Sequence, residues 1–376
     1  MGKTSKSEAS MLDFTSALYL GLCHPSETLR PWAQLTTGRP AALQAPPGTE
    51  SITESLIRLL RCEGATLGTS TLHIFWDVFK VLATDPIGIY IDAGAYPIAR
   101  WGVERVSAQG VPTANFQRHD SAALADLLRR HQRFNHRPVV VTDGLCPATG
   151  RTAPIVEYLN LVRARGGYLV IDDTQALGIL GHHPGPNAPY GRGGGGTPAW
   201  HGLQAPELIV GSSLAKGFGV PLAVLAGSKS ITERFEHNSA TRMHCSPPSV
   251  ALIHAAEQAL KINESRGEHL RLRLAQRVQR FRERLQEVGL AASGGLFPVQ
   301  TLQPIAAIDT ARLHSVLQGA GVETVLHRRR NGLAARISFL LTASHRPEDI
   351  DRAVAMLANI VAQQRPRQRI KVGYHE

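Results

Sequence analysis

The segment YLVIDDTQALGILG, residues 168–181, decides the expected fold. Its apolar run is typical of a strand buried on both faces, and it ends in two adjacent carboxylates. The carboxyl end of such a strand is where α/β proteins bind their ligands. Because side chains alternate along a strand, Asp172 and Asp173 should point to opposite sides, so that one of them can face a site. Alone, the motif is weak, since acidic residues also cap helices and bind metals.

A second segment, ELIVGSSLAKGFGVPLAVLAGS at 207–228, contains a lysine between two apolar strands. Small residues on both sides of Lys216 would let a bulky ring approach its amine. A lysine near an apolar edge can have a lowered pKa, and imine formation requires the neutral amine. Taken alone, the segment is explained equally well by a surface lysine in a loop.

Outward from these segments, short apolar runs alternate with helical patterns between about residues 50 and 230. The patterns predict strands at 88–92, 138–142, 168–172, 208–212 and 222–226, and helices at 52–62, 121–132, 153–165 and 249–262. This alternation favours an α/β fold with a mainly parallel sheet covered on both faces.

The chain after Asn263 changes in character. A long Arg/Glu/Leu helix is expected near 267–288, followed by strands near 299–302, 324–327 and 335–341, which favours a smaller α/β domain. We therefore expect an N-terminal segment 1–45, a large domain 46–264 and a small C-terminal domain 265–376 with a basic tail. The Gly/Pro-rich stretch 181–202 does not connect a strand to a helix, so a flexible surface insertion is favoured over a phosphate cradle.

The composition excludes several classes of function. The net charge of +11 would attract an acidic ligand, but much of the excess lies in 266–284 and 365–371 and is expected to face water. No aromatic platform for bases accompanies it, so nucleic acid is not expected as a partner. No apolar run is long enough for a membrane span. The four scattered cysteines lack the spacing of a metal site or a disulfide framework, which favours a cytoplasmic protein.

Together, the two segments resemble the fold-type I enzymes that use pyridoxal 5′-phosphate (PLP), specifically the α-oxoamine synthase family of the class II aminotransferase superfamily. Further landmarks in the same order are LDFTSALYLGL (12–22), FQRHDSAALADLL (116–128), TDGLCPATGRTAPI (142–155), SPPSVAL (246–252) and RISFLLTASHRPEDID (336–351). The resemblance covers most of the chain. It implies a large domain with a seven-stranded type of sheet, a small C-terminal domain, and a homodimer with its site at the subunit interface.

The resemblance also implies roles for individual residues. Lys216 would bind PLP as a Schiff base and move the substrate α-proton. Asp172 would pair with the pyridine nitrogen and keep it protonated, so that the ring acts as an electron sink. The cofactor phosphate would be bound by Ser213 and by a segment ahead of a helix, composed of Ser70, Thr71 and Leu72.

Three further positions are expected at the cofactor. Tyr96 falls where the family stacks a histidine on the ring, and a tyrosine still offers a flat face. Gln175 falls where the family has a second histidine, and it can donate to the phenolic oxygen but cannot titrate. His244 falls where the family reaches the phosphate of the partner subunit.

Other departures from the family concern the substrate. A serine near the cofactor oxygen is Pro147 here, an asparagine that helps hold the substrate carboxylate is Ala17, and the arginine that clamps this carboxylate aligns with Ser338. Serine cannot replace a bidentate arginine. Arg336 lies two positions earlier on the same face of the expected strand. Either Arg336 or the run Arg328–Arg330 supplies the charge from a shifted position, or the amino substrate is unusual; the sequence leaves both open.

Three hypotheses for function follow. The family pattern favours a decarboxylative condensation in which an amino acid, or a related amine, forms an external aldimine on the cofactor bound by Lys216, displaces the lysine, and attacks an acyl thioester of coenzyme A or of a carrier protein. Loss of both histidines and of the carboxylate clamp keeps an aminotransferase, or another PLP reaction of specialised metabolism, as the alternative. A non-catalytic partner subunit is disfavoured, since it would need neither Lys216 nor Asp172.

Overall fold

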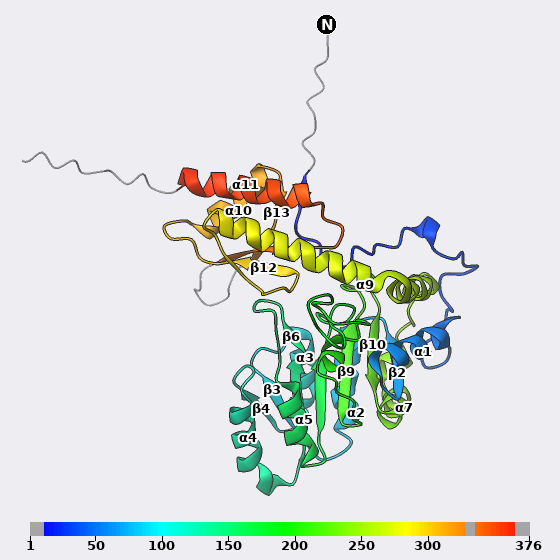
Figure 1. Ribbon diagram of the computed structural model, residues 1–376. Helices are drawn as coiled ribbons and strands as arrows, with labels where there is room; N and C mark the ends of the chain where they lie inside the picture. Colours follow the sequence, from blue (N-terminus) through cyan, green and yellow to red (C-terminus); the bar gives the residue numbers. More distant parts are fainter. Residues whose placement is uncertain (1–10, 328–334, 365–376) are drawn as a thin grey trace, which may run out of the picture. The chain divides into compact units, whose positions relative to one another are not determined.

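The computed structural model of the protein describes residues 11–327 and 335–364 (Figure 1). The chain forms two compact units. The large unit comprises Leu18–Pro147 and Arg151–Arg273, and the small unit comprises Met1–Ala17, Ala148–Gly150 and Leu274–Glu376. These units are defined by compactness, so the domain boundaries expected at 45/46 and 264/265 stay predictions.

The large unit contains a seven-stranded sheet with the strand order β2-β10-β9-β8-β5-β3-β4. Its strands are β2 (Gly64–Gly68), β3 (Ile87–Asp92), β4 (Thr113–Phe116), β5 (Arg137–Asp143), β8 (Tyr168–Asp172), β9 (Leu208–Ser213) and β10 (Ala223–Gly227). Strand β10 alone runs in the direction opposite to that of the other six strands of this sheet. The expected mainly parallel sheet is confirmed, and all five predicted strands are present, whereas β2 and β4 were not predicted. A separate short hairpin pairs β6 (Leu145–Cys146) with β7 (Arg151–Thr152).

Helices cover both faces of this sheet. The helices of the large unit are α1 (Thr49–Leu60), α2 (Thr71–Leu82), α3 (Pro97–Ser107), α4 (Ser121–Arg130), α5 (Ile155–Arg163), α6 (Gly196–Trp200), α7 (Lys229–Asn238) and α8 (Ala240–His244), with the first part of α9 (Val250–Glu287) and the 3-10 turns η1 (Ser26–Thr28) and η2 (Gln132–Phe134). One core joins α1, α4, α5 and α9 to one face of the sheet, and the other joins α2, α3 and α7 to the opposite face. Alternate residues of each central strand enter these two cores, so the strands are continuous apolar runs.

A glycine lets α2 and α3 pack closely. A Cβ added to Gly102 in α3 would overlap the backbone carbonyl oxygen of Phe75 in α2. Backbone cannot move aside as a flexible side chain can. The contact therefore requires glycine despite its cost inside a helix.

We expect Gly102→Ala to lower the free energy of unfolding by about 1–3 kcal/mol, because the added methyl group must push two packed helices apart. Urea denaturation followed by circular dichroism measures this change. Gly185→Ala is the matched control, because an added Cβ there meets nothing within 4 Å. Its effect should stay within about 0.5 kcal/mol. Equal midpoints for the two variants would contradict the packing argument.

The small unit is built around a four-stranded antiparallel sheet with the order β11-β12-β15-β14. Its strands are β11 (Ala292–Ser293), β12 (Val299–Leu302), β14 (Val325–His327) and β15 (Arg336–Leu340), and its helices are α10 (Thr310–Gly319), α11 (Pro347–Gln364) and the end of α9. In addition, β1 (Leu12–Asp13) pairs in parallel with β13 (Val322–Glu323). The three predicted strands are present. The helices expected at 249–262 and 267–288 are one helix, α9.

The Gly/Pro-rich stretch 181–202 is a surface segment only in its first half: residues 183, 184, 186 and 187 are exposed, whereas residues 194–199 are buried, so the prediction of a surface insertion was wrong for the second half. Its glycines 194–196 are buried against the rest of the large unit. Asn263 donates to the carbonyl oxygen of Gly193 at 3.0 Å, and the backbone N–H of Gly193 donates to Glu268 at 2.8 Å. Arg271, 2% exposed, bonds both Asn263 and the carbonyl oxygen of Gly178. Close backbone packing explains the glycine content better than flexibility does.

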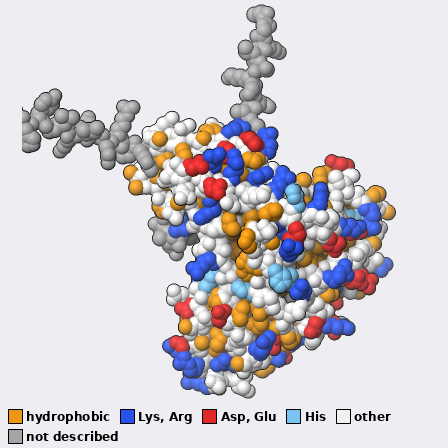
Figure 2. Space-filling view, in the orientation of Figure 1, with side chains coloured by type: hydrophobic (Ala, Val, Ile, Leu, Met, Phe, Trp, Pro, Cys, Tyr) orange, Lys and Arg blue, Asp and Glu red, His pale blue; other side chains and the backbone are white. Residues whose placement is uncertain are grey.

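Most of the basic residues near 266–284 have acidic partners or face water, but Arg271 is buried, contrary to expectation. Within the small unit, Arg280 and Arg284 both pair with Asp351. On the face shown in Figure 2, Lys and Arg side chains lie among acidic, polar and apolar ones.

No helix in the described part of the chain is both long and apolar enough to cross a membrane.

Candidate active site

The carboxyl ends of β8 and β9 bring Asp172 and Lys216 to one edge of the large sheet. The two strands are adjacent and parallel, with Asp172 in register with Gly211. Strand β9 ends at Ser213, and Lys216 lies in the turn that follows. Gly211 has no side chain, and the ring of Phe75 from α2 packs where one would be. Because both residues lie at the carboxyl ends of parallel strands, they are at the edge where α/β sheets bind ligands.

Asp172 and Lys216 act on each other electrostatically without touching. Burial lowers the pKa of the Lys216 amine, and the charge of Asp172 partly opposes this. Burial likewise raises the pKa of the Asp172 carboxyl, against the effects of Thr174 and Lys216. The Lys216 nitrogen and the Asp172 carboxylate oxygens do not approach within 4.0 Å of each other, so the two side chains form no ion pair. Burial therefore shifts each of the two groups toward its neutral form relative to the same group in water.

Thr174 links the ends of the two strands. Its backbone N–H donates to Asp172 Oδ1 at 3.1 Å, and its Oγ1 accepts from the backbone N–H of Ser213 at 3.1 Å. Ser213 Oγ in turn accepts from the N–H of Ala215 at 3.2 Å, next to the lysine. These bonds fix the acid relative to the start of the lysine turn. Thr174 could not be predicted from the sequence, because its position after β8 does not indicate that its side chain reaches β9.

Asp173 points to the opposite side of the sheet, as the strand alternation predicts. It is fully buried and accepts from the N–H of Thr197 at 2.8 Å and from its hydroxyl at 2.5 Å. Burial raises the pKa of this carboxyl to about 7. Asp173 therefore anchors the Gly-rich stretch, whereas Asp172 faces Lys216.

The turn that carries Lys216 is held by packing. The N–H of Leu214 donates to the carbonyl oxygen of Leu222 at 2.8 Å. A Cβ on Gly217 would overlap the carbonyl oxygen of Leu177, so only glycine fits there. His24 Nε2 lies 2.7 Å from the carbonyl oxygen of Phe218. The lysine therefore starts from a fixed backbone, which favours a defined position for its amine.

The N-terminus of α2 lies at the same edge of the sheet. Gly68, the last residue of β2, pairs with Ala223, which pairs with Ser213. Ser70 is the N-cap of α2, and Thr71 and Leu72 are its first residues. The free N–H groups and the positive end of the helix dipole favour an anion here. Missed by the sequence analysis, His73 lies at this end, with Nδ1 2.8 Å from Ser70 Oγ and 2.9 Å from Thr69 Oγ1.

Tyr96 and Gln175 each have a partner that the sequence analysis missed. Tyr96 is the N-cap of α3, is 57% exposed, and donates its backbone N–H to Asp143 Oδ1 at 2.9 Å. Gln175 Oε1 accepts from the hydroxyl of Tyr19 at 2.9 Å. Burial raises the pKa of this tyrosine, so it stays protonated and donates. The amide nitrogen of Gln175 is left as the donor toward a ligand.

The structure does not test whether the remaining predicted residues belong to the site. His244 is exposed at the end of α8. Ser338 and Arg336 belong to β15 of the small unit. Ser338 is fully buried with its Oγ 2.7 Å from that of Thr301, whereas Arg336 is exposed. Arg328, Arg329 and Arg330 lie outside the described residues. The expected substrate and phosphate contacts of these residues stay predictions.

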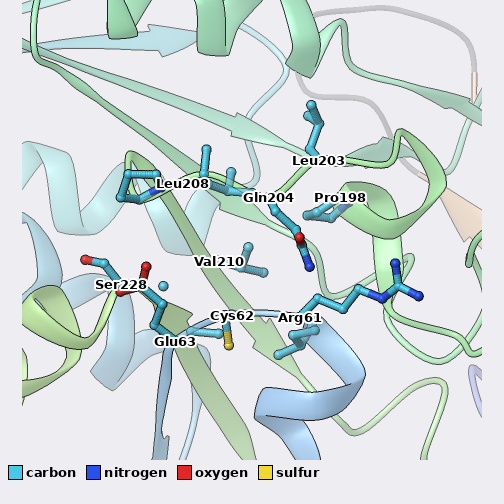
Figure 3. A pocket seen from close by; sticks show the side chains of 14 residues that line it. Arg61, Cys62, Glu63, Pro198, Leu203, Gln204, Leu208, Val210 and Ser228 are labelled. Carbon is cyan, nitrogen blue, oxygen red and sulfur yellow. The ribbon is translucent and has the colours of Figure 1, made fainter.

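A cavity of about 270 Å³ lies at the other end of the same strands (Figure 3). It is lined by Arg61, Cys62 and Glu63 before β2, by Leu208 at the start of β9 and by Ser228 after β10. Because β2 and β9 begin there, the cavity is on the edge opposite Lys216. It contributes nothing to the candidate site. No cluster of metal-binding side chains exists among the residues the structure describes.

Comparison with known proteins defines the class. Residues 26–357 match the model of the family described as aminotransferase class I and II, so the chain belongs to that family. It is 28% identical over 253 residues to 8-amino-7-oxononanoate synthase from Serratia proteamaculans, which covers 65% of this chain and 61% of the relative. The matched part thus spans about three fifths of the length of that curated relative.

Solved structures show the same fold. The 8-amino-7-oxononanoate synthase of Francisella tularensis superimposes with a TM-score of 0.71 and 18% identity, covering 94% of this chain and 99% of that one. A structure described as SPT with a PLP internal aldimine gives a TM-score of 0.79 and 15% identity, covering 93% and 87%. The expected fold-type I architecture and the resemblance to α-oxoamine synthases are both confirmed.

Proposed function

We propose that the chain is a PLP-dependent transferase that condenses an amino acid, or a related amine, with an acyl thioester and releases carbon dioxide. One observation carries the proposal: a buried Asp172 and a half-buried Lys216 lie at one edge of the sheet and act on each other through their charges without forming an ion pair. Burial opposes the charged form of each group. A small ring held covalently by Lys216 at one end, with a protonated nitrogen at the other, would give the buried Asp172 carboxylate an opposite charge.

The donor set fits PLP. Burial lowers the pKa of Lys216 and so raises the fraction of neutral amine that can bind an aldehyde. A protonated pyridine nitrogen beside Asp172 would bring the carboxylate back to its charged form. Ser213 and the start of α2, from Ser70 to Leu72, would hold the phosphate. These groups all lie at the carboxyl edge of the large sheet.

When bound, PLP supplies an electron sink that stabilises a carbanion next to the substrate nitrogen. Asp172, fixed by Thr174, would keep the pyridine nitrogen protonated. The neutral amine of Lys216 would take up and return the substrate proton. Tyr96 would cover one face of the ring, and the Gln175 amide, oriented by Tyr19, would donate to the phenolic oxygen.

We also propose how substrates and subunits meet. Arg336, with Ser338 beside it in β15, would hold the substrate carboxylate, although the buried Ser338 hydroxyl already bonds Thr301. The basic chain, with its net charge of +11, suits the phosphates of an acyl-CoA or of an acyl-carrier protein. A cytoplasmic homodimer is proposed from the family resemblance, with the exposed His244 reaching the phosphate of the partner subunit.

An aminotransferase is the second candidate. The matching family is described by that activity. In addition, Tyr96 and Gln175 stand where the α-oxoamine synthases have two histidines. This chain therefore lacks two side chains that could transfer protons at those positions. A non-catalytic subunit stays disfavoured, because the chain retains both Lys216 and Asp172.

One assay separates the two candidates. PLP-loaded protein is supplied with single amino acids and an acyl-CoA, and free thiol is followed with a colorimetric thiol reagent. Condensation predicts thiol release that needs the amino acid, the acyl-CoA and Lys216, together with carbon dioxide from the amino acid. Transfer of the amino group to a keto acid without thiol release would replace the first proposal by the second. Lys216→Ala, which should release thiol only at the spontaneous rate, corrects for thioester hydrolysis.

A further inference from the structure

A third carboxyl lies beside Asp172 on the same side of the sheet. Asp143 ends β5, which is parallel and adjacent to β8, and its register partner is Asp172. Neighbouring strands in a sheet are about 4.8 Å apart, and in-register residues of parallel strands point to the same face. Val141 of β5 and Val170 of β8 enter the core formed with α2 and α3, so alternation puts Asp143 and Asp172 on that side as well.

Asp143 is connected to a second residue of the candidate site. It accepts the backbone N–H of Tyr96, the N-cap of α3. This is the N–H of the residue whose ring is proposed to cover the cofactor. A change at Asp143 therefore reaches the site by two routes, through the backbone of Tyr96 and through charge.

The charged groups around Asp143 come from several elements. Burial raises the pKa of Asp143 most, the charges of Asp172 in β8 and Asp92 in β3 raise it further, and the Tyr96 N–H and Arg118 lower it. The balance raises this pKa to about 7. In the other direction, the negative charge of Asp143 favours the protonated form of Lys216. The charge of Asp143 therefore changes near neutral pH, and that charge acts on the Lys216 nitrogen.

We propose that Asp143 is a positioning residue of the site, which holds Tyr96 in place through its backbone N–H and adjusts the protonation of the Lys216 nitrogen through its own charge. The inference rests on the proposed function, because its readout is the cofactor bound at Lys216. The sign follows from the charges. As pH rises through about 7, Asp143 becomes anionic and holds the proton on the Lys216 nitrogen to a higher pH.

The test is a pH titration of the visible absorbance of PLP-loaded protein. Asp143→Asn keeps an oxygen that can accept from Tyr96 but removes the charge. We expect it to lower the pH midpoint of the Lys216-bound cofactor by roughly half a unit or more. Asp143→Ala removes the acceptor as well, and should in addition weaken PLP retention during dialysis several-fold. Asp126→Asn, at an exposed aspartate in α4, should titrate as the wild type does.

The outcomes are distinct. An Asp143→Asn midpoint equal to that of the wild type would overturn the inference and leave the proposed function standing. Absence of Lys216-dependent absorbance in every protein, the wild type included, would overturn the proposed function and the inference with it. If Asp143→Asn does not fold, Asp143→Ser, which is also neutral and retains an oxygen, must show the same lowered midpoint. An unchanged midpoint in that variant counts against the inference equally.

Discussion

Lys216→Ala should lose the visible absorbance of the PLP-bound protein and lower kcat by about 10³-fold or more. The expected loss is large because the lysine has two functions in the proposed site, covalent attachment of the cofactor and movement of the substrate proton. Alanine can do neither. Absorbance spectroscopy after reconstitution with PLP gives the first readout, and the thiol-release assay gives the second.

Lys229→Ala is the matched control, because it removes the same charge from an exposed position at the start of α7. It should keep both the absorbance and the rate. If Lys216→Ala stayed yellow and active while folding normally, the proposed attachment site would be wrong.

Asp172→Asn is expected to separate binding from chemistry. Asparagine has nearly the same shape but cannot keep the pyridine nitrogen protonated, so the electron sink weakens. The variant should still bind PLP at Lys216 and keep its colour, while kcat falls by roughly 10²–10⁴-fold. Steady-state kinetics at saturating PLP measures this loss.

Asp173→Asn is the control for that variant. Its carboxyl is also buried but bonds Thr197 on the other side of the sheet. Replacing it should change the free energy of unfolding more than the rate of the PLP-loaded protein. A catalytic loss at Asp173 as large as the loss at Asp172 would contradict the assignment of Asp172 as the acid that faces the ring.

Much of the fold could be predicted because the central strands are runs of Val, Ile and Leu. Strand β2, Gly64–Gly68, is the counterexample. It has a glycine at each end, which weakens any strand pattern, and its pairing with β10 creates it. A Cβ on Gly64 would overlap the side chain of Thr232 in α7, so packing requires that glycine. Local sequence does not contain that information.

The continuity of α9 was hidden for a similar reason. Gly267 suggests a break between two helices, yet the helix runs through it. A Cβ there would lie 2.6 Å from Asn263 Oδ1 and 2.8 Å from Arg271 Nη2. The glycine therefore makes room for the buried arginine that holds the Gly-rich stretch. The same contact explains why neither the burial of Arg271 nor that of the stretch was foreseen.

The placement of Lys216 and Asp172 at one edge of the sheet could be predicted because each follows an apolar strand, whereas their roles stay predictions. Thr174, Tyr19 and Asp143 could not be predicted. Thr174 matters because it reaches β9, and Tyr19 because it reaches Gln175 across 156 positions of the chain. Asp143 matters through its register with β8. Register and long-range contacts exist only in the folded chain.

The central claim is that Lys216 alone holds PLP at this site. Borohydride reduction of PLP-loaded protein fixes the cofactor on whichever amine it occupies, and peptide mass spectrometry then identifies that lysine. The account predicts the pyridoxyl group on the peptide that contains Lys216. Label on exposed lysines such as Lys80, Lys229 and Lys261, with Lys216 unmodified, would contradict it.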